Sequence, residues 1–235
     1  MQTLAQRHRL KMLALQQAAA APQDAHGAPQ GSAYELMQAQ LHEHLRTLKN
    51  IHSVEKKIEA KRAMLADFEP YLDGVLQANS GAQDVVLSTV LVWHIDVGNW
   101  ARALQLARYA LVHGLKLPDQ YNRDLPTLLI DEYADAALAG KLTGEDALKH
   151  LSAVGELTQA RDAPDQARAK LHKAVGWALL GKTAMADVDP KNLPPGTCQA
   201  ALTHLLRAIE LWPQVGVKKD VERLQRRLAG DKPAA

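Results

Sequence analysis

Residues 33–66 read AYELMQAQLHEHLRTLKNIHSVEKKIEAKRAMLA, a stretch without proline or glycine. Most of its residues belong to the strongest helix formers, namely Ala, Leu, Met, Glu, Gln, Lys and Arg. One column of residues repeats every seven positions: Met37, His44, Ile51, Ile58 and Leu65. This period is typical of a helix with one apolar side. The sequence therefore predicts one long helix over residues 33–66.

A second apolar column runs along only the first half of this helix. Leu41 and Leu48 supply it, and Glu55 and Arg62 take its next two positions. The first half therefore predicts a two-column seam of the kind that joins helices of different subunits. We expect oligomerisation through five residues: Met37, Leu41, Leu48, Ile51 and Ile58.

The rest of the chain predicts an all-α fold. Of its 235 residues 47% are apolar but only 4% are aromatic, which favours a helical core of Ala, Leu and Val. Residues 83–97 are apolar on nearly every side, and a run of this length predicts a buried helix rather than a strand. Residues 69–79 predict a short separate helix with Pro70 in its first turn and Gly81 as its stop.

Basic residues gather at the two ends of the chain. Residues 1–62 carry nine Lys/Arg and five Asp/Glu, residues 63–160 carry six and thirteen, and residues 161–235 carry thirteen and eight. Because basic surfaces attract polyanions, these ends are candidates for DNA binding, with a merely solvated charged surface as the alternative.

The DNA-binding candidates near the N-terminus lie on a basic arm and on the polar face of the long helix: Arg7, His8, Arg9, Lys11, Arg46, Lys49, Lys56, Lys57, Lys61 and Arg62. A second group on the last helix is a candidate for binding either DNA or a partner protein: Lys218, Lys219, Arg223, Arg226 and Arg227.

The sequence shows no catalytic constellation, and we expect no cofactor and no metal. The single cysteine, Cys198, excludes a disulfide framework and a multi-cysteine zinc site. Asp131, Glu132 and Asp135 are the best candidates for a Mg²⁺ site, but such a cluster is usually a solvated helix face. We expect the ATPase to be another chain. No apolar run is long enough to predict a membrane span.

Six short stretches occur in order along the chain: Ala5-Gln6-Arg7-His8, Leu45-Arg46-Thr47-Leu48-Lys49, Gly81-Ala82-Gln83-Asp84, Ala107-Arg108-Tyr109-Ala110-Leu111, Arg168-Ala169-Lys170-Leu171-His172-Lys173 and Gly216-Val217-Lys218-Lys219. Together they resemble the small terminase subunit of temperate, long-contractile-tailed phages that package DNA from cohesive-end sites. The resemblance runs from about Leu4 to about Leu228. Many small terminases carry a clear helix-turn-helix, and this sequence does not.

The resemblance implies a non-catalytic subunit of a DNA-packaging enzyme in the host cytoplasm. Such a subunit binds double-stranded phage DNA at the packaging site, forms a ring-like homo-oligomer and delivers DNA to the terminase large subunit, which supplies the ATPase and nuclease activities. Two alternatives remain open. One is a tetratricopeptide-like adaptor that binds only protein, and the other is an endonuclease subunit that itself cuts DNA.

We expect four segments along the chain. Residues 1–32 form the basic arm and a flexible linker, residues 33–67 the long helix for DNA binding and oligomerisation, and residues 68–160 a helical core. Residues 161–235 form C-terminal helices and a basic tail helix. Small residues at Ala201 and Ala208 resemble a tetratricopeptide repeat, although a generic antiparallel helix pair fits them equally well.

Overall fold

The computed structural model describes residues 3–20 and 31–230, so most of the predicted linker lies outside the described residues. The described residues form ten α-helices and one short 3-10 helix, and they contain no strand. The predicted all-α fold is confirmed. Contacts group the chain into two compact units, residues 1–125 and 126–235. The division between them falls inside the segment 68–160 that the sequence suggested as one helical core.

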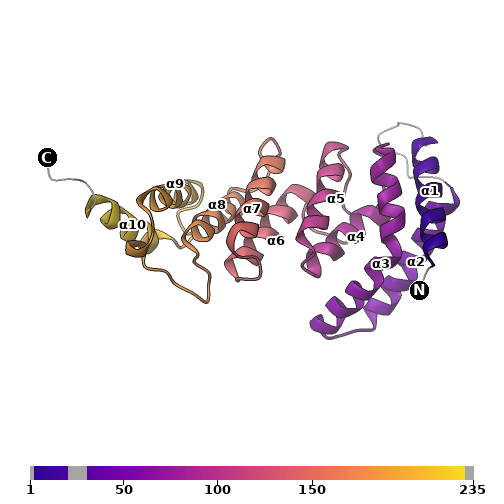
Figure 1. The fold of residues 1–235 in the computed structure, drawn as a ribbon, viewed down its shortest axis with the longest axis horizontal. Helices are drawn as coiled ribbons and strands as arrows, with labels where there is room; N and C mark the ends of the chain where they lie inside the picture. Colours follow the sequence, from indigo (N-terminus) through magenta and orange to yellow (C-terminus); the bar gives the residue numbers. More distant parts are fainter. Residues whose placement is uncertain (1–2, 21–30, 231–235) are drawn as a thin grey trace. The chain divides into compact units, whose positions relative to one another are not determined.

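The first unit contains five helices (Figure 1). They are α1 (Leu4–Ala20), α2 (Ser32–Lys49), α3 (Val54–Ala78), α4 (Val85–Asp96) and α5 (Trp100–Val112).

The stretch 33–66 is not one helix, and that prediction was wrong. Four residues, Asn50–Ser53, separate α2 from α3. The Asn50 N–H bonds the Thr47 carbonyl at 3.2 Å and closes α2, and the Ser53 hydroxyl accepts the Lys56 N–H at 3.4 Å and opens α3. Asn and Ser side chains compete with the helical backbone and favour helix ends. These two residues therefore interrupt a stretch whose other residues favour a helix.

α3 continues through the segment that the sequence predicted as a separate helix. It includes Pro70, which cannot donate a backbone hydrogen bond to the preceding turn. Phe68, Tyr71 and Leu72 around it are buried, and their packing offsets this loss. α3 ends at Asn79, which takes the left-handed conformation with φ 52°, rather than at Gly81.

α4 is the buried helix that the sequence predicted, and ten of its twelve residues, Val86–Ile95, are buried. Its first turn is capped by the Asp84 carboxylate, which accepts the Leu87 N–H at 2.9 Å and the Tyr71 hydroxyl at 2.6 Å. Burial raises the pKa of Asp84, against the opposing effect of these hydrogen bonds. Because α4 has no polar side, helices α2, α3 and α5 all pack against it.

α1 crosses α3 at a glycine. A Cβ atom at Gly74 would lie 2.5 Å from the Lys11 carbonyl oxygen and 2.8 Å from the Ala14 Cβ, so only glycine allows this approach. The Gln17 side chain accepts the Ala33 N–H at 2.9 Å and donates to the Ser32 hydroxyl at 3.1 Å. It thereby caps the first turn of α2, whose own N-cap residue is a glycine. α1 is a helix docked on α3, and the sequence had suggested a short basic helix or arm for residues 3–17.

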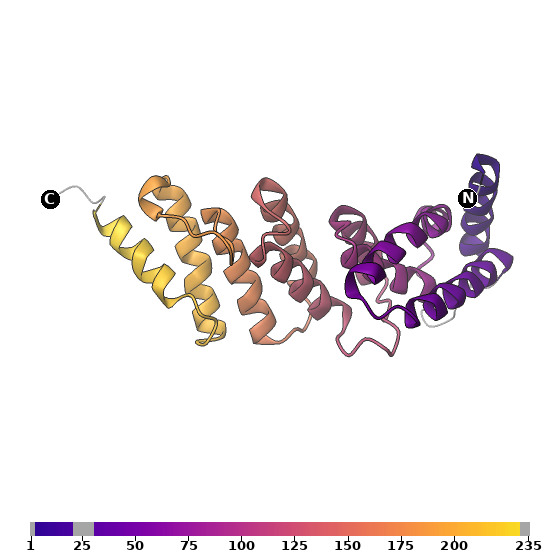
Figure 2. The same ribbon diagram turned by 90° about the horizontal axis from the view of Figure 1, so that it is seen from below.

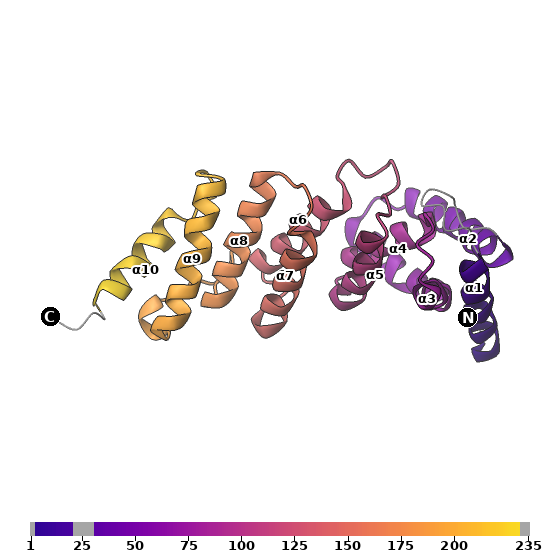
Figure 3. The same ribbon diagram turned by 90° about the horizontal axis from the view of Figure 1, so that it is seen from above.

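The second unit contains α6 (Leu125–Leu138), α7 (Gly144–Thr158), α8 (Asp165–Leu180), the 3-10 helix η1 (Pro190–Asn192), α9 (Pro195–Leu211) and α10 (Lys218–Gly230). Helices α7 to α10 lie side by side in chain order (Figures 2 and 3). α8 approaches α9 at Gly176, where a Cβ atom would lie 2.6 Å from Leu205 Cδ2. Cys198 is buried in the core that α8, α9 and α10 share. The tetratricopeptide likeness stays a prediction.

We expect Gly74→Ala to release α1 from α3. The added methyl meets backbone atoms that cannot move without moving the helix, and such overpacking costs about 1–3 kcal/mol. Hydrogen exchange followed by mass spectrometry should show faster exchange in residues 4–20, with α4 unchanged.

The matched control is Gly155→Ala in α7, where the nearest atom lies at 3.9 Å. This variant should be neutral or slightly stabilising, because Ala is the better helix former. Unchanged exchange of α1 in the Gly74→Ala protein would show that the close approach is not what holds it.

Candidate nucleic-acid interface

The break between α2 and α3 gathers four of the predicted DNA-binding residues at one place, which we call the α2–α3 elbow (residues 46–57). Arg46 and Lys49 lie in the last turn of α2, and Lys56 and Lys57 lie in the first turn of α3. Arg46 pairs with Glu43 at 3.0 Å, but both side chains are largely exposed. Within the described residues, Lys49, Lys56 and Lys57 have no ion-pair partner. Their charge is therefore available to an external anion.

Two other predicted DNA-binding residues on α3 are held by the protein itself. The Lys61 ammonium lies 2.5 Å from the Asp96 carboxylate, and Arg62 donates to the Val97 carbonyl at 3.3 Å. Both contacts join α3 to the C-terminal end of α4. The structure thus gives Lys61 and Arg62 a role in packing within the unit.

The four N-terminal candidates lie on α1, away from the elbow. Arg7, His8 and Arg9 are exposed, and Lys11 is half-buried at the crossing with α3. About 30 Å of helix separates Gly74, where α1 crosses, from the start of α3, at 1.5 Å per residue. Arg9 lines the same hollow as Gln40 of α2 and Asp67 of α3, and Lys11 lies beside Gly74, so both are placed along α3 beyond its first turn.

The predicted oligomerisation seam faces the interior of the first unit. Met37 is completely buried, Leu41 is 2% exposed and Leu48 is 6% exposed. Ile51 and Ile58 are half-buried. In this fold the seam packs against the chain's own helices, so Met37, Leu41 and Leu48 are not available to a second subunit. The periodicity identified an apolar face correctly but not what covers it.

The C-terminal candidates divide into two groups. Lys218, Lys219 and Arg226 are exposed on α10. Arg223 instead contacts the loop after α8, donating to Asp187 at 2.8 Å and to the Val188 carbonyl at 3.1 Å. Arg227 reaches the same loop at the Pro190 carbonyl, at 3.4 Å.

Lys170 of α8 lies between the carboxylates that were the best Mg²⁺ candidates. Its ammonium is 2.7 Å from Asp131 and 3.1 Å from Asp135 of α6. Burial lowers the pKa of Lys170, but these two carboxylates raise it above its ordinary value overall, so the ammonium stays charged. Across the described residues, no group of three or more His, Cys, Asp or Glu side chains could hold a metal. A positively charged group therefore already lies where a divalent ion would bind.

Comparison with known proteins decides the family. The family model described as phage small terminase subunit matches residues 38–166, more than half of the chain. The chain belongs to the phage small terminase subunit family. It is also 40% identical over 225 residues to a protein of Escherichia phage P2 named "Terminase, endonuclease subunit", an alignment covering 95% of this chain and 85% of the relative. No solved structure matches. No described helix has both the length and the hydropathy to cross a membrane.

Membership of this family confirms the resemblance predicted from the sequence and gives the chain a role in a phage DNA-packaging terminase. DNA and a terminase large subunit are the partners that this family implies. Several stretches that carry the resemblance are buried packing elements of this terminase subunit rather than chemical sites.

Two of these stretches meet in the first unit. The Gly81 N–H donates to the Tyr109 hydroxyl at 2.9 Å, and a Cβ atom at Gly81 would lie 2.4 Å from His113 Nδ1. Gly81 also has φ 77°, which favours glycine. The stretches 81–84 and 107–111 therefore form one joint between the start of α4 and the end of α5.

A partly buried polar network on α3, α4 and α5 of this terminase subunit has no signal in the sequence. The Glu69 carboxylate lies 3.2 Å from His94 Nε2 and 2.7 Å from the Arg102 guanidinium, which also contacts Asp73 at 2.7 Å. Burial raises the pKa of Glu69, but the His94 and Arg102 contacts lower it overall. Arg102 comes from a helix 33 residues away, so no local spacing could have found this network.

A pair of histidines joins α8 to α9. The Nδ1 atoms of His172 and His204 lie 3.0 Å apart, so one neutral ring donates to the other. Burial lowers the pKa of His172 to about 4, and the charges of His204, Arg207 and Arg168 contribute in the same direction. Burial also lowers the pKa of His204. The contact is therefore one between neutral rings near neutral pH.

This pair predicts a loss of stability in acid. From its ordinary pKa of 6.5 down to about 4, His172 takes up a proton in the unfolded chain but not in the folded chain. Because the unfolded state binds more protons there, the free energy of unfolding should fall as the pH falls through this window. His172→Gln should remove part of that fall, measured as Tm at pH 7.5 and pH 5. His8→Gln, a change at an exposed histidine of α1, serves as control and should follow the wild type. Equal losses in the His172→Gln and wild-type proteins would contradict this assignment.

Proposed function

We propose that this small terminase subunit binds phage DNA at the packaging-initiation site near the cohesive end, and that the α2–α3 elbow makes the main phosphate contacts. The observation that carries the proposal is the clustering at one exposed turn of Arg46, Lys49, Lys56 and Lys57, three of which have no ion-pair partner in the described residues. Double-stranded DNA presents one phosphate charge per about 1.7 Å of axis, so such a cluster can neutralise several phosphates together.

The position of Lys56 and Lys57 supports this role. Both lie in the first turn of α3, where the helix dipole is positive and an added cation destabilises the helix by about 0.3–1 kcal/mol. A phosphate placed here would contact two ammonium groups and the positive end of a helix. Glu55 in the same turn offsets one of these two charges, and the remaining excess of positive charge favours an anion.

Assembly completes the proposed mechanism. The subunit would form a ring-like homo-oligomer in the host cytoplasm, so that several elbows engage one DNA molecule and individually weak contacts act together. It would then deliver the DNA to the large subunit, which carries the ATPase and nuclease activities. The exposed cations of α10, Lys218, Lys219 and Arg226, are available for either partner.

Two other functions remain as alternatives. A protein-only adaptor would fit the stacked helices of the second unit, but it would not need a cluster of unpaired lysines at the elbow. An endonuclease would fit the name of the phage P2 relative. Its candidate carboxylates Asp131 and Asp135, however, are already bound by Lys170.

The elbow is tested by changing Lys49, Lys56 and Lys57 together to Gln. We expect weaker binding to a fluorescently labelled duplex that contains the packaging site. The slope of log affinity against log salt should flatten by about 0.9 for each lost phosphate contact. Fluorescence anisotropy over a salt titration measures both quantities.

The matched control changes Lys116, Lys141 and Lys149 to Gln. These lysines are also exposed, and the control removes the same charge from other helices and loops. Its slope should stay near that of the wild type. If both triple variants lose the same affinity and slope, binding reflects net charge alone and the elbow is not the interface.

A second experiment concerns catalysis. We expect the purified chain with Mg²⁺ or Mn²⁺ not to cut DNA containing its packaging site, and the addition of the large subunit and ATP to restore cutting. A gel assay of supercoiled plasmid detects single nicks. The control variant carries Asp131→Asn, Glu132→Gln and Asp135→Asn. Nicking by the wild-type chain alone that this variant abolishes would establish the endonuclease alternative instead.

A further inference from the structure

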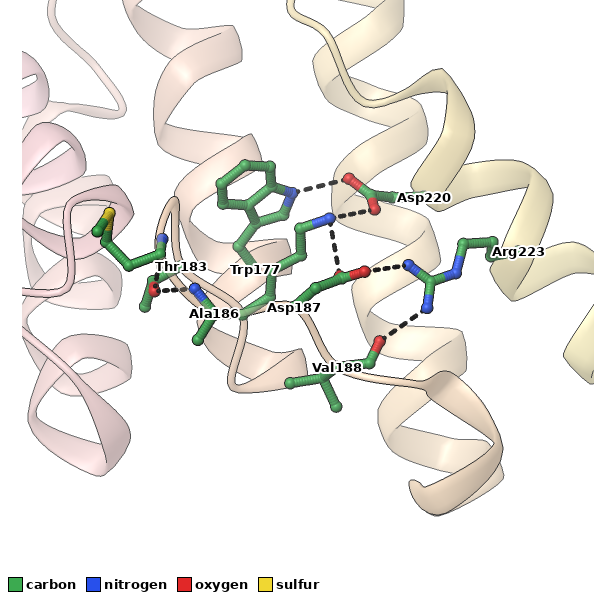
Figure 4. A network of polar contacts seen from close by, with 9 residues as sticks. Trp177, Thr183, Ala186, Asp187, Val188, Asp220 and Arg223 are labelled. Atoms are coloured by element: carbon green, nitrogen blue, oxygen red, sulfur yellow. Dashed lines mark hydrogen bonds and ion pairs between the residues drawn. The ribbon is translucent and has the colours of Figure 1, made fainter.

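The loop between α8 and α9 places one exposed carboxylate between two cations. The Asp187 side chain is 59% exposed, and each of its oxygens has its own partner. Oδ1 lies 3.1 Å from the Lys182 ammonium, and Oδ2 accepts from Arg223 Nη1 at 2.8 Å. Figure 4 shows the Asp187 carboxylate directed at the Arg223 guanidinium. A phosphate group can be bound in the same way, with a lysine contacting one of its oxygens and an arginine contacting another.

The two cations are held in place by contacts other than Asp187. Lys182 lies 2.6 Å from the carboxylate of Asp220, which is 8% exposed. The Trp177 indole N–H donates to the other oxygen of Asp220 at 3.0 Å, as Figure 4 shows. Arg223 donates through its second terminal nitrogen to the Val188 carbonyl at 3.1 Å. The cationic pair is therefore preorganised, and an anion that replaced Asp187 would find both groups in position.

The surroundings are positively charged. Lys173 and Lys182 lie over the Trp177 ring, with their nitrogens 4.7 and 4.8 Å from its centroid. Arg227 contacts the same loop, and α10 adds exposed Lys218 and Lys219 at its start. Asp220 is buried, whereas Asp189 of the loop and Glu222 of α10 are exposed. Of these carboxylates, Asp187 is the one that contacts both Lys182 and Arg223.

Asp187 is held as an anion but remains accessible to exchange. The Arg223 hydrogen bond, followed by that of Lys182, lowers the pKa of Asp187 to about 2. An exposed carboxylate makes weak ion pairs, because water and salt screen them. A DNA backbone can displace it, since other phosphates of the same molecule are bound elsewhere on the protein at the same time.

We propose that Lys182 and Arg223 form a second DNA-phosphate site, which Asp187 occupies as an internal substitute for phosphate in the unbound chain. This inference rests on the proposed DNA-binding function. It adds a phosphate-binding site in the second unit, which the Asp187 carboxylate occupies until DNA displaces it.

The test is a double-mutant cycle on full-length protein with the labelled packaging-site duplex. Asp187→Asn removes the competing charge and keeps the shape of the side chain. We expect it to raise DNA affinity by up to about fivefold, the upper range for an exposed ion pair. Arg223→Gln should weaken binding and flatten the log–log salt slope by about 0.9. In the double variant, the gain from Asp187→Asn should disappear, because the site that Asp187 covers has lost its arginine.

Glu222→Gln is the matched control. It removes one negative charge from the exposed surface of α10, beside Arg223 in the sequence, without a contact to the loop. Its affinity should stay near that of the wild type. Thermal denaturation of every variant separates binding from folding, since a purely structural ion pair would lower the Tm of the Asp187→Asn protein without raising its affinity.

Three results would overturn the proposal. Unchanged or lower affinity of the Asp187→Asn protein would make Asp187 a structural contact only. An equal gain in the Glu222→Gln protein would show a general effect of charge, and a gain that persists in the double variant would exclude Arg223. If the elbow variant loses affinity but the cycle shows no coupling, this inference fails and the proposed function stands. A wild-type chain that binds no DNA would refute both this inference and the proposed function.

Discussion

α4 has no polar side, and this single constraint organises the first unit. A helix that buries ten consecutive residues is stable only when other helices cover its whole circumference. α2, α3 and α5 supply that cover, and their own apolar stripes are used in doing so. This is why Met37, Leu41 and Leu48 face inward, although their spacing also fits a seam between subunits. At the N-terminus of α4 the buried Leu87 N–H is satisfied by the Asp84 carboxylate, which the Tyr71 hydroxyl supports.

The arrangement of cations follows from the same packing. α3 begins seven residues before Lys61, where it meets the C-terminal end of α4, so lysines about one turn apart have different environments. Near α4, Lys61 meets Asp96 and becomes part of the unit. At the free end, Lys56 and Lys57 meet no carboxylate within the described residues. Lysines that look alike in the sequence therefore divide into structural ones and available ones, according to whether another helix ends beside them.

Much of the fold could be predicted from the sequence because its signals are local. Glycines and prolines set most helix ends, and α8, which begins after Pro164 and ends before Gly181, is an example. The break at Asn50–Ser53 was missed because the seven-residue apolar period continues across it, as α2 and α3 both turn their apolar residues toward the interior. Pro70 suggested a helix start, but the burial of its neighbours keeps it inside α3. Periodicity shows which face is apolar and gives no information on its partner.

The candidate DNA-binding site also has some features that the sequence could predict and others that depend on tertiary contacts. The sequence identified the elbow lysines by composition, but their convergence depends on the turn that it missed. Contacts between distant residues had no sequence signal at all. Lys170 lies between Asp131 and Asp135, and Arg223 contacts Asp187, only because particular helices pack together. A side chain's partner, and hence its role, is a property of tertiary structure here.

The Gln17 side chain has a practical consequence for fragments of this protein. The family match begins at residue 38, which invites expression of a shorter chain starting near that point. Such a fragment would lack Ala33, Tyr34 and Met37 of the core, together with the α1 backbone that covers Gly74. Even a chain that kept all of α2 but lacked α1 would leave the Ala33 N–H without the amide that caps it. The segment that the family model matches and the segment that must be produced together are therefore different lengths of chain.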